Sequence, residues 1–516
     1  MLSSVRNTAR RVLAMIRHMS LPKIMMMLFV ICAFLPGIAQ DETAEDQDQA
    51  YRYHIPFPES NFRGDWQFTL VAGPDLASDY TLTVHSYNFF GEPLHDPQVL
   101  NFTAGKPYFW QETPGAAKVA AALEVQTRIL ESTVPLSGVL WVYDPTSDVL
   151  NAVSLTDVVR NELIMPHIPS DFLSWSTSFS IAGVGGDVNQ IADIAFDYFS
   201  NTRSGNTTAW SGLEANAYHN GTPFRDILIS DVDAVTWGKV SVQDGASDFR
   251  LAGYQTYLKS KDGVQSAAIE LVDEPVHKGY FGFSRHETWQ FSDWFAFTNP
   301  HDGPVDINMT LFYVSGEGDN QVMTANQIIT LPARNRYNYV LGLNLFEEVE
   351  GLPIGLEYSA FQPIVDEDAE PVEMPVLITH LQSDVDSTAL GAHAPQERGN
   401  RTVVFLTERF DQRVDLYNPS IGESDSVDVI VHYADGQDPL VKQVEVPAGQ
   451  NVTVSYSQLI EDIKASLPEE TELVVEDALR VEINSPRGLF YIKLTGYQDG
   501  DYGIVNPKTR YVRVEF

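Results

Sequence analysis

Apolar and polar residues alternate along many short stretches of this 516-residue chain. Clear examples are DYTLTVHSY (79–87), VDINMTLFYV (305–314), DSVDVIVHYA (425–434) and QNVTVSYSQ (450–458). A period of two places every second side chain on one face, which is the pattern of a half-buried β-strand. Glycine-containing turns bound these stretches, as in FFGEP (89–93), SGEGD (315–319), ADGQD (434–438) and PAGQN (447–451). The pattern predicts antiparallel sheets packed as sandwiches.

One longer phrase occurs twice. The segments DWFAFTNPHDGPVDINMTLFYVSGEG (293–318) and RVDLYNPSIGESDSVDVIVHYADGQ (413–437) share an apolar run, Asn-Pro, a polar turn, an alternating strand and a glycine turn. Looser versions open near residues 53 and 161, and Trp66, Trp175 and Trp289 are spaced at a similar interval. A period of about 110 residues is the size of one small sandwich domain.

The chain is therefore predicted to be all-β, with four tandem antiparallel β-sandwich (Ig-like) units and short capping helices. The predicted boundaries are a signal peptide at 1–39, an acidic linker at 40–52 and units at 53–160, 161–276, 277–390 and 391–516. Helical patterns are sparse, and the two predicted capping helices are NLFEEVEG (344–351) and SQLIEDIKASL (457–467). Trp66, Trp175 and Trp294 recur beside a predicted core strand, which favours buried, structural roles for them.

The first 39 residues have the pattern of a secretion signal. Arg10, Arg11, Arg17 and Lys23 precede the apolar run IMMMLFVICAFLPGIAQ, and Gly37 and Ala39 supply the small residues of a cleavage site. Met19 would begin a better-proportioned signal. Cys32, the only cysteine, lies inside this segment, so the mature chain has none. This favours an exported bacterial protein that is secreted, periplasmic or held on the outer cell surface.

The charge is strongly acidic. The chain has 33 Lys+Arg and 70 Asp+Glu, and removing residues 1–39 takes away five basic residues, leaving 28 against 70, or −42. Such a surface repels nucleic acid and anionic lipid, which argues against both as partners. It is compatible with cation binding or with solubility alone. No second apolar stretch approaches the roughly 20 residues of a transmembrane helix.

The repeated features resemble the tandem β-sandwich modules of exported bacterial proteins. The resemblance rests on Trp175, Trp294, Asn299-Pro300, Asn418-Pro419, Pro332-Ala333, Pro447-Ala448 and the closing segment Pro135–Gly138. It covers most of residues 53–502 and is clearer in the third and fourth units than in the first two. These modules have no settled activity, so the resemblance implies a fold and no catalytic residues.

Motifs of familiar enzymes are missing from the sequence. HETWQ (286–290) lacks the second histidine of a zinc protease helix, and neither a GxSxG elbow nor a phosphate-binding glycine loop occurs. Carboxylate pairs and Ser/His/Asp triads need not be close in sequence, so an enzyme stays open.

Two kinds of residue are candidates for binding. Solvated turns are the preferred interpretation of the acidic clusters. If one of them binds calcium, QDGDYG (498–503) suits it best, with Asp499 and Asp501 as ligands. Trp110, Trp210 and Trp237 lie in irregular contexts and are candidate ligand-binding residues, and the polar insertion at about 201–224 of the second unit is the predicted ligand region.

The function predicted from these observations is that of an exported, non-enzymatic bacterial surface or matrix protein, with a glycan or cell-surface protein as partner. The alternative is a carbohydrate-active hydrolase with its active site between units. A deep cleft with paired carboxylates about 5 to 10 Å apart would favour the hydrolase.

Overall fold

A computed structural model of the chain describes most of residues 51–505. The undescribed residues are 1–50, 57–66, 113–124, 126, 146–148, 170–174, 186–189, 201–203, 222–234, 246, 260–264, 273, 284–290, 316–321, 364–370, 385–389, 394–395, 397–398, 419, 421, 434–436, 469–476, 488–490, 499–500 and 506–516. The predicted signal peptide, Trp66 and Asp499 are therefore outside the described residues. Residues 50–516 form one compact unit.

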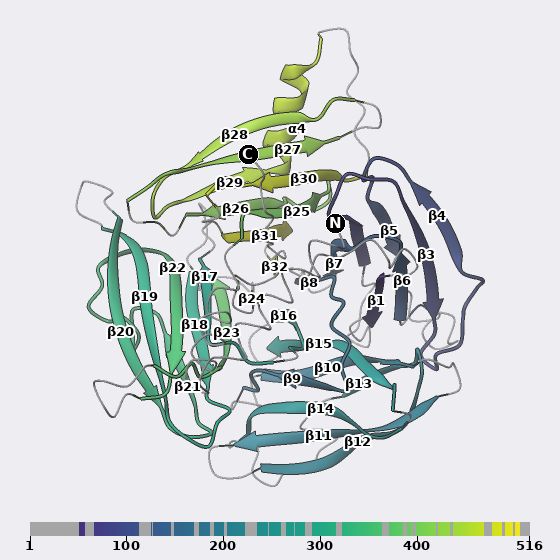
Figure 1. Ribbon diagram of the computed structural model, residues 1–516, viewed down its shortest axis with the longest axis vertical. Coiled ribbons are helices and arrows are strands. Elements are labelled where there is room, and N and C mark those ends of the chain that lie inside the picture. The colour runs from purple at the N-terminus through teal and green to yellow at the C-terminus, as the bar shows by residue number, and fades with distance from the viewer. Residues whose placement is uncertain are drawn as a thin grey trace, which may run out of the picture. The chain divides into compact units, whose positions relative to one another are not determined.

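Consecutive strands combine into sheets in groups of eight (Figure 1). The first set is β1 (Tyr51–Pro56), β2 (Gln67–Pro74), β3 (Tyr80–Tyr87), β4 (Gln98–Phe102), β5 (Tyr108–Glu112), β6 (Thr127–Ser132), β7 (Leu136–Asp144) and β8 (Val149–Ser154). The second set is β9 (Glu162–Met165), β10 (Trp175–Val184), β11 (Ile191–Ser200), β12 (Ser204–Glu214), β13 (Tyr218–Gly221), β14 (Val235–Gly245), β15 (Arg250–Lys259) and β16 (Gln265–Glu270).

The third set is β17 (Lys278–Gly282), β18 (Phe291–Thr298), β19 (Val305–Ser315), β20 (Val322–Leu331), β21 (Arg336–Val340), β22 (Gly351–Phe361), β23 (Leu377–Asp384) and β24 (Leu390–His393). The fourth set is β25 (Arg401–Leu406), β26 (Arg413–Tyr417), β27 (Asp425–His432), β28 (Leu440–Val446), β29 (Asn451–Ser455), β30 (Leu479–Asn484), β31 (Tyr491–Gln498) and β32 (Asp501–Val505), with α4 (Tyr456–Ser466) between β29 and β30.

Each set of eight strands forms two four-stranded antiparallel sheets with the same strand order. In the first set the orders are β1-β6-β3-β4, the outer sheet, and β5-β2-β7-β8, the inner sheet, and the other three sets repeat these orders. Apolar residues of the two sheets, such as Phe68 and Leu70 of β2 and Leu82 and Val84 of β3, pack into one core. The all-β prediction is confirmed, and facing sheets with a core between them are a sandwich arrangement.

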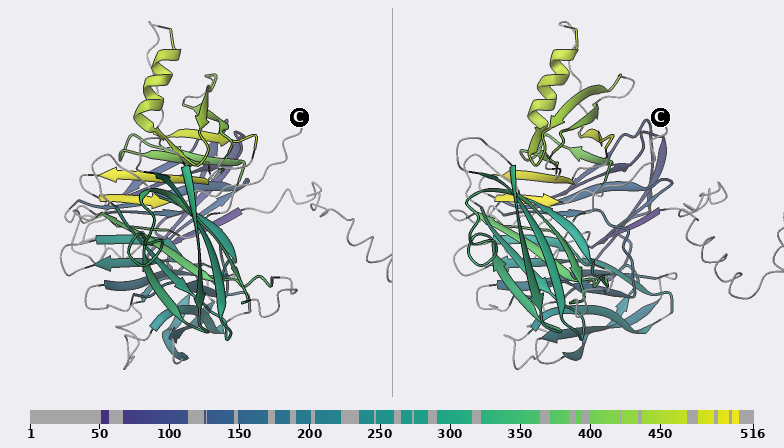
Figure 2. Two further views of the ribbon diagram at one scale, coloured as in Figure 1. Left: turned by 90° about the vertical axis from the view of Figure 1, so that its left-hand side faces the viewer. Right: turned by 60° about the vertical axis from the view of Figure 1, so that its left-hand side comes forward.

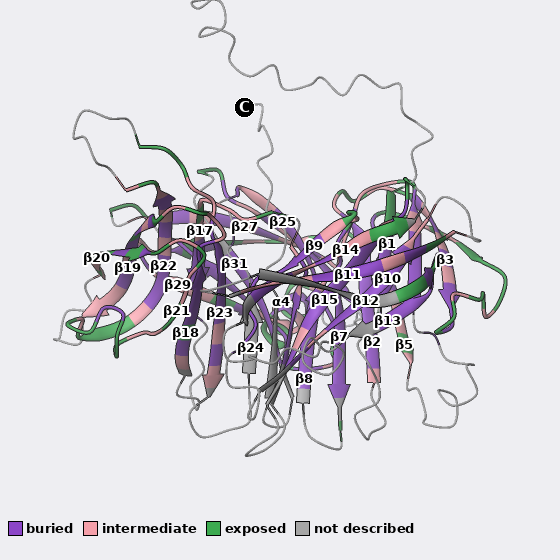
Figure 3. Ribbon diagram, turned by 90° about the horizontal axis from the view of Figure 1, so that it is seen from below, coloured by how far each residue is buried: buried purple, intermediate pink, exposed green. Residues whose placement is uncertain are grey.

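The alternating sequence pattern produces these cores directly. Along β27 (Asp425–His432) buried and half-buried residues alternate without exception, and β3 and β19 show the same alternation over most of their length. Buried residues line the strands in Figure 3, whereas exposed residues are frequent in the turns. One face of each such strand thus fills a core while the other is partly covered or meets water.

Each set packs against the next, and the fourth packs against the first. Between the first and second sets, β1 contacts β10 and β15. Between the second and third, Ile164 and Trp237 pack with Leu377, and between the third and fourth, Tyr280 and Phe312 pack with Tyr417. Between the fourth and first, Val403 and Phe405 pack with Val71. The last strands of the sets also meet, since β8 and β24 each contact both β16 and β32. In Figure 2 the yellow β31 and β32 run beside the blue strands of the first set. The four sets therefore close into a circle of contacts.

A four-residue turn joins the fourth and fifth strands of every set. A backbone hydrogen bond closes each turn, from Lys106 to Thr103, Ala217 to Glu214, Asn335 to Pro332 and Gln450 to Pro447. The third residue of each turn is left-handed, with φ of +77° at Gly105, +65° at Asn216, +54° at Arg334 and +61° at Gly449. The PAGQ and PARN segments of the sequence are therefore two forms of one turn.

The Asn-Pro phrase ends the second strand of a set, and the asparagine side chain there forms hydrogen bonds with nearby backbone groups. The Asn299 amide Nδ2 donates to the carbonyl oxygens of Gly303, Leu331 and Pro332, at 2.8, 3.2 and 3.0 Å. Its Oδ1 accepts from the His301 N–H at 2.9 Å. Asn418 repeats this arrangement, since its amide donates to Glu423 and Val446 and accepts from Ser420. Both asparagines are buried, so these side-chain hydrogen bonds satisfy backbone groups that water does not reach.

One predicted capping helix forms and the other does not. In α4, Ser455 is the N-cap and its hydroxyl accepts from the Gln458 N–H, while Leu459 and Ile463 enter the core. Residues 344–351 form turns instead. The Asn344 side chain accepts the Val340 N–H there, and Phe346 adopts a φ of +55°, which a helix does not allow. The predicted helix at 344–351 is therefore wrong.

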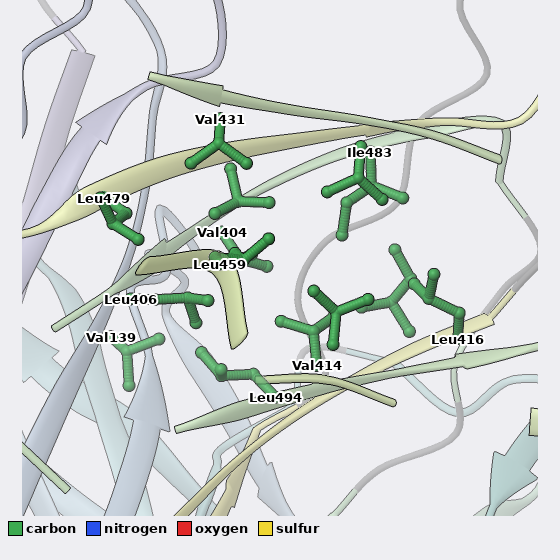
Figure 4. Packing of buried hydrophobic residues seen from close by; sticks show 14 of the residues in the cluster. Val139, Val404, Leu406, Val414, Leu416, Val431, Leu459, Leu479, Ile483 and Leu494 are labelled. Carbon is green, nitrogen blue, oxygen red and sulfur yellow. The ribbon is translucent and has the colours of Figure 1, made fainter. Parts of the chain in front are cut away.

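The prediction of buried repeat tryptophans is wrong for Trp294, whose residue is 47% exposed. Among the tryptophans whose side chains are described, Trp141 of β7 is fully buried, and it lies against the Phe410 ring at a centroid distance of 5.5 Å. Trp141 and its strand neighbour Val139 belong to the core of the fourth set, where Val139 lies beside Leu406 and Leu494 (Figure 4). Strand pairing also places residues 391–393 in the third set, through β24, whereas the sequence began the fourth unit at 391.

No helix in the described part of the chain combines the length and apolar character needed to cross a membrane.

Candidate functional site

Two exposed phenylalanine side chains lie beside the predicted ligand region of the second set. They belong to the turn Asn88–Pro93 after β3, called here the aromatic turn. Phe89 is 38% and Phe90 56% exposed, and their rings meet edge to face at a centroid distance of 5.4 Å. Large apolar groups held in water at a fixed position are typical of interaction surfaces.

The Asn88 side chain organises the aromatic turn. Its Oδ1 accepts the N–H groups of Phe90 and Glu92 at 2.9 and 3.0 Å, and its Nδ2 donates to the Glu92 carboxylate at 2.9 Å. Asn88 itself is buried. A buried asparagine that bonds the backbone of the next residues fixes a turn in one conformation. The two phenylalanine side chains are thus attached to an ordered backbone.

Glycine is required in the aromatic turn because the second set lies against it. Gly91 has a φ of +79°, and a Cβ there would stand 2.7 Å from the Ala215 carbonyl oxygen and 2.8 Å from the Ala217 nitrogen. The Tyr218 N–H donates to the Phe89 carbonyl oxygen at 3.2 Å, and the two rings are 6.0 Å apart. The aromatic turn therefore joins the first set to residues 215–218.

The geometry suits the stacking of a flat apolar surface. Two rings at 85° to each other present a face and an edge, and their backbone is ordered before any ligand arrives. Less conformational entropy is then lost on binding. The Glu92 carboxylate lies in the same turn and is an acceptor for hydroxyl groups.

The structure places the three predicted tryptophans in different surroundings. Trp110 of β5 is half-buried, and the Arg128 guanidinium carbon stands 3.7 Å from its ring centroid. Trp237 of β14 is buried and stacks on Phe199 at 3.9 Å. Trp210 lies on β12 opposite Ile194 in the strand register, and its side chain is outside the described residues. Trp237 is thus part of the contact between the second and third sets and not of an exposed surface.

The calcium candidates fall at the edge of what the structure describes. Asp499 is not described, and Asp501 begins β32 with its side chain undescribed. Within the described residues, no three His, Cys, Asp or Glu side chains are grouped so that they could hold a metal ion.

Several buried ionisable side chains join one set to another. Asp415 of β26 accepts from the Thr453 hydroxyl at 2.6 Å and faces Lys493 across the strand register, and Lys493 donates to the Gly282 carbonyl oxygen of the third set. Burial raises the pKa of Asp415, against the opposing effects of Thr453 and the Lys493 charge. These groups tie β26 and β31 to β17, so their chemistry serves the contact between sets.

A second buried polar group lies inside the third set. His380 Nε2 stands 2.9 Å from the Asp293 carboxylate, which also accepts from the Gln382 amide at 2.7 Å. His380 stacks on Phe295 at 4.4 Å, and the ring edges of Phe281 and Phe283 surround it. The histidine and the aspartate are both buried, as expected for a pair that orders a core.

His54 gives the chain a defined dependence on pH. It lies on the face of β1 opposite Tyr53 and Ile55, and β1 packs against β10 and β15. Burial, aided by the charges of Arg52 and His85, lowers the pKa of His54 from 6.5 to about 3. Below pH 6.5 His54 is protonated in the unfolded chain but stays neutral in the folded protein. The free energy of unfolding therefore falls as the pH falls from 6.5 towards 3.

The variant His54→Gln is expected to remove this dependence. Between pH 7.5 and pH 5 the loss of unfolding free energy should shrink by about 2 kcal/mol, since one proton contributes about 1.4 kcal/mol per pH unit below 6.5. Urea unfolding followed by circular dichroism at each pH measures it. His95→Gln, at an exposed position, is the control and should keep the wild-type slope. Equal slopes in wild type and His54→Gln would contradict the assignment.

Sequence reasoning missed Phe89 and Phe90, although the segment FFGEP was identified as a turn. The sequence contained an indication of their exposure, because two adjacent phenylalanines in a predicted turn belong to no strand face that could bury them. No known family model matches the chain, and no curated protein is detectably similar to it in sequence.

Proposed function

We propose that the chain is an exported, non-enzymatic bacterial surface or matrix protein that binds a glycan or a protein partner through the aromatic turn and the adjoining face of the second set. In this proposal the four sets are four copies of one Ig-like sandwich module, as the resemblance to tandem modules of exported proteins implies. Their loops would carry the binding function and their strands the scaffold.

The exposure of Phe89 and Phe90 on an ordered turn carries the proposal. An exposed apolar pair costs solubility and contributes little to a core, so its presence on a hydrogen-bonded turn favours a binding role. The ionisable groups whose pKa values are shifted favour a non-enzymatic role, because they serve contacts within the fold. Asp415, Arg336 and Arg480 have pKa values shifted by burial, and each bonds or faces a group of a neighbouring strand or set.

A binding screen tests the proposal. The purified chain is applied to a polysaccharide panel and to cell-envelope fractions in high salt, with and without calcium. Phe90→Ala and Phe89→Ala are expected to weaken binding about 10- to 100-fold each, as central aromatic contacts do. Trp210→Ala in the same screen tests the neighbouring β12.

Trp294→Ala is the matched control, because Trp294 is similarly exposed but lies in the third set. It should bind as the wild type does. Absence of binding to every member of the panel, or an equal loss in Trp294→Ala, would refute the aromatic turn as the binding surface.

A further inference from the structure

A buried histidine lies in the contact between the first and second sets. His54 of β1 is 2% exposed, and neither of its ring nitrogens has a hydrogen-bond partner in the part of the chain that the structure describes. It alternates with the core residues Tyr53 and Ile55, so its side chain lies on the opposite face of β1. That strand contacts β10 and β15 of the second set. A positive charge on this ring would therefore be buried and unpaired.

The aromatic turn begins beside this histidine. In the outer sheet of the first set, His54 lies opposite Ile129 of β6, and Ile129 lies opposite His85 of β3. The next side chain along β3 on the same face is Tyr87, whose ring stacks on that of His85 at a centroid distance of 6.3 Å. Asn88, the first residue of the aromatic turn, follows directly. One face of the outer sheet thus carries His54 and continues into the aromatic turn.

Tyr218 completes the contact on the side of the second set. Its N–H donates to the Phe89 carbonyl oxygen at 3.2 Å, and its hydroxyl oxygen stands 3.2 Å from the Ser180 hydroxyl of β10. Ser180 lies opposite Tyr254 of β15, and Tyr254 packs against the core of the first set. The second set therefore connects the aromatic turn to β10 and β15, the strands that β1 contacts.

The surroundings of His54 oppose a positive charge on its ring. Burial, aided by the charges of Arg52 and His85, lowers the pKa of His54. The Glu131 carboxylate on the same face already stands 3.1 Å from both the Arg52 Nε and the His85 Nε2. β10 has no titratable residue, and Tyr254, by which β15 packs against the first set, stays neutral because burial raises its pKa. Protonation of His54 is therefore coupled to separation of the two sets.

We propose that acid opens this contact, because protonation of His54 drives β1 away from β10 and β15 and frees the aromatic turn from residues 215–218. For a ligand, the inference rests on the function proposed above. The two phenylalanine side chains are held in place only while the contact is closed, so acid would oppose binding. Protonation of a histidine at an interface with two states is a recognised form of pH switch.

The size of the effect follows from linkage between protonation and opening. In the open contact His54 would titrate near its ordinary pKa of 6.5, whereas in the closed contact its pKa is about 3. Between these values the ratio of open to closed contact should rise about tenfold for each pH unit of acidification, or about 30-fold from pH 6.5 to pH 5. Above pH 6.5 His54 is neutral in both states, so the ratio should stay constant.

Hydrogen exchange of the full chain without ligand tests the opening. Exchange rates are measured at pH 7.5 and pH 5 and divided by the rates of unstructured peptides at the same pH. Protection of the Tyr218 amide, which donates across the contact, should fall about 30-fold at pH 5. The Tyr280 amide is the internal control, since it donates to Gln396, whose side chain binds Ile492 of the fourth set. It should lose no protection.

Two variants show whether His54 takes up the proton. His54→Gln and His54→Leu should both leave the Tyr218 amide equally protected at pH 7.5 and pH 5. Leucine has no polar atom that needs a partner, so it keeps the measurement valid where the buried amide of glutamine lowers stability. The melting temperature checks that each variant is folded. His95→Gln, at an exposed position, should respond to acid as the wild type does.

Unchanged protection of Tyr218 at pH 5 would overturn the proposal, as would a loss that persists in both His54 variants. An equal loss at Tyr218 and Tyr280 would also overturn it, since unfolding of the whole chain would then take up the proton. Because the exchange experiment contains no ligand, its result is independent of the binding screen. A screen without any ligand would refute the aromatic turn as a binding surface and leave the opening of the contact as measured.

Discussion

Replacing Trp141 by alanine is expected to lower the free energy of unfolding by about 3–5 kcal/mol, the usual cost of deleting a fully buried aromatic side chain. Trp141 belongs to β7 of the first set but fills the core of the fourth, against Phe410. A Cβ on Gly496 would stand 2.6 Å from the Trp141 ring, so the ring reaches the backbone of β31. The midpoint of urea unfolding, followed by far-ultraviolet circular dichroism, measures the effect.

Two further variants control this prediction. Trp294→Ala removes the same side chain from an exposed position and should cost less than about 1 kcal/mol. Trp141→Phe keeps most of the packing and should fall between them, since no described group accepts a hydrogen bond from the Trp141 indole N–H. Equal losses in Trp141→Ala and Trp294→Ala would contradict the placement of Trp141 in the core of the fourth set.

Replacing Arg480 by methionine is expected to cost about 1.5–3 kcal/mol, the range for hydrogen bonds made by a charged group, because Glu482 keeps its ion pair with Arg401 at 3.2 Å. Arg480 of β30 is fully buried and donates to the carbonyl oxygen of Asp75 in the first set at 2.8 Å. Its guanidinium also stands 3.3 Å from the Glu482 carboxylate. Burial, with the charge of Arg401, lowers the pKa of Arg480 against the opposing effect of Glu482.

Arg480→Met should loosen the contact between the first and fourth sets as well as lower the free energy of unfolding of the whole chain. Hydrogen exchange is expected to quicken at the contact between β25 and β2, because the Asp75 carbonyl oxygen would lose its bond from Arg480 and keep the one from Arg401, at 2.9 Å. Arg487→Met is the control, since Arg487 forms an exposed pair with Glu423 in the same set, and it should cost less than about 1 kcal/mol. An Arg480→Met variant as stable as Arg487→Met would show that the first and fourth sets are held together by other contacts.

Strands were predictable from the sequence because each sandwich core needs one apolar face. The alternating segments 79–87, 305–314 and 425–434 coincide with β3, β19 and β27 to within two residues. The Asn-Pro phrase stands between an apolar run and a polar turn in the sequence, and β18 and β26 end directly before it. The three carbonyl bonds of the Asn299 amide were not predicted, because two of the acceptors lie more than thirty residues away at Leu331 and Pro332.

Burial of individual tryptophans was not predictable because it depends on distant parts of the chain. Trp294 was expected inside by its spacing, yet it lies on the face of β18 opposite the core residues Phe295 and Phe297 and is 47% exposed. Trp141 is covered by residues more than 250 positions later, such as Phe410 and Gly496. The exposure of Phe89 and Phe90 likewise depends on how residues 215–218 meet the turn. Period and composition describe a strand and its core face, but not which neighbour covers its other face.

The contact between the first and fourth sets also sets an order of events in folding. The face of β7 that carries Trp141 has its partners in residues 404–494, so it stays uncovered while everything before them is being made. Contacts of such long sequence separation form late and slowly. The first set can fold early around its own core. The apolar face of β7 that carries Trp141 nevertheless stays exposed, and open to aggregation, until the strands of the fourth set have formed. A chain truncated before β25 (Arg401–Leu406) would keep that face open permanently.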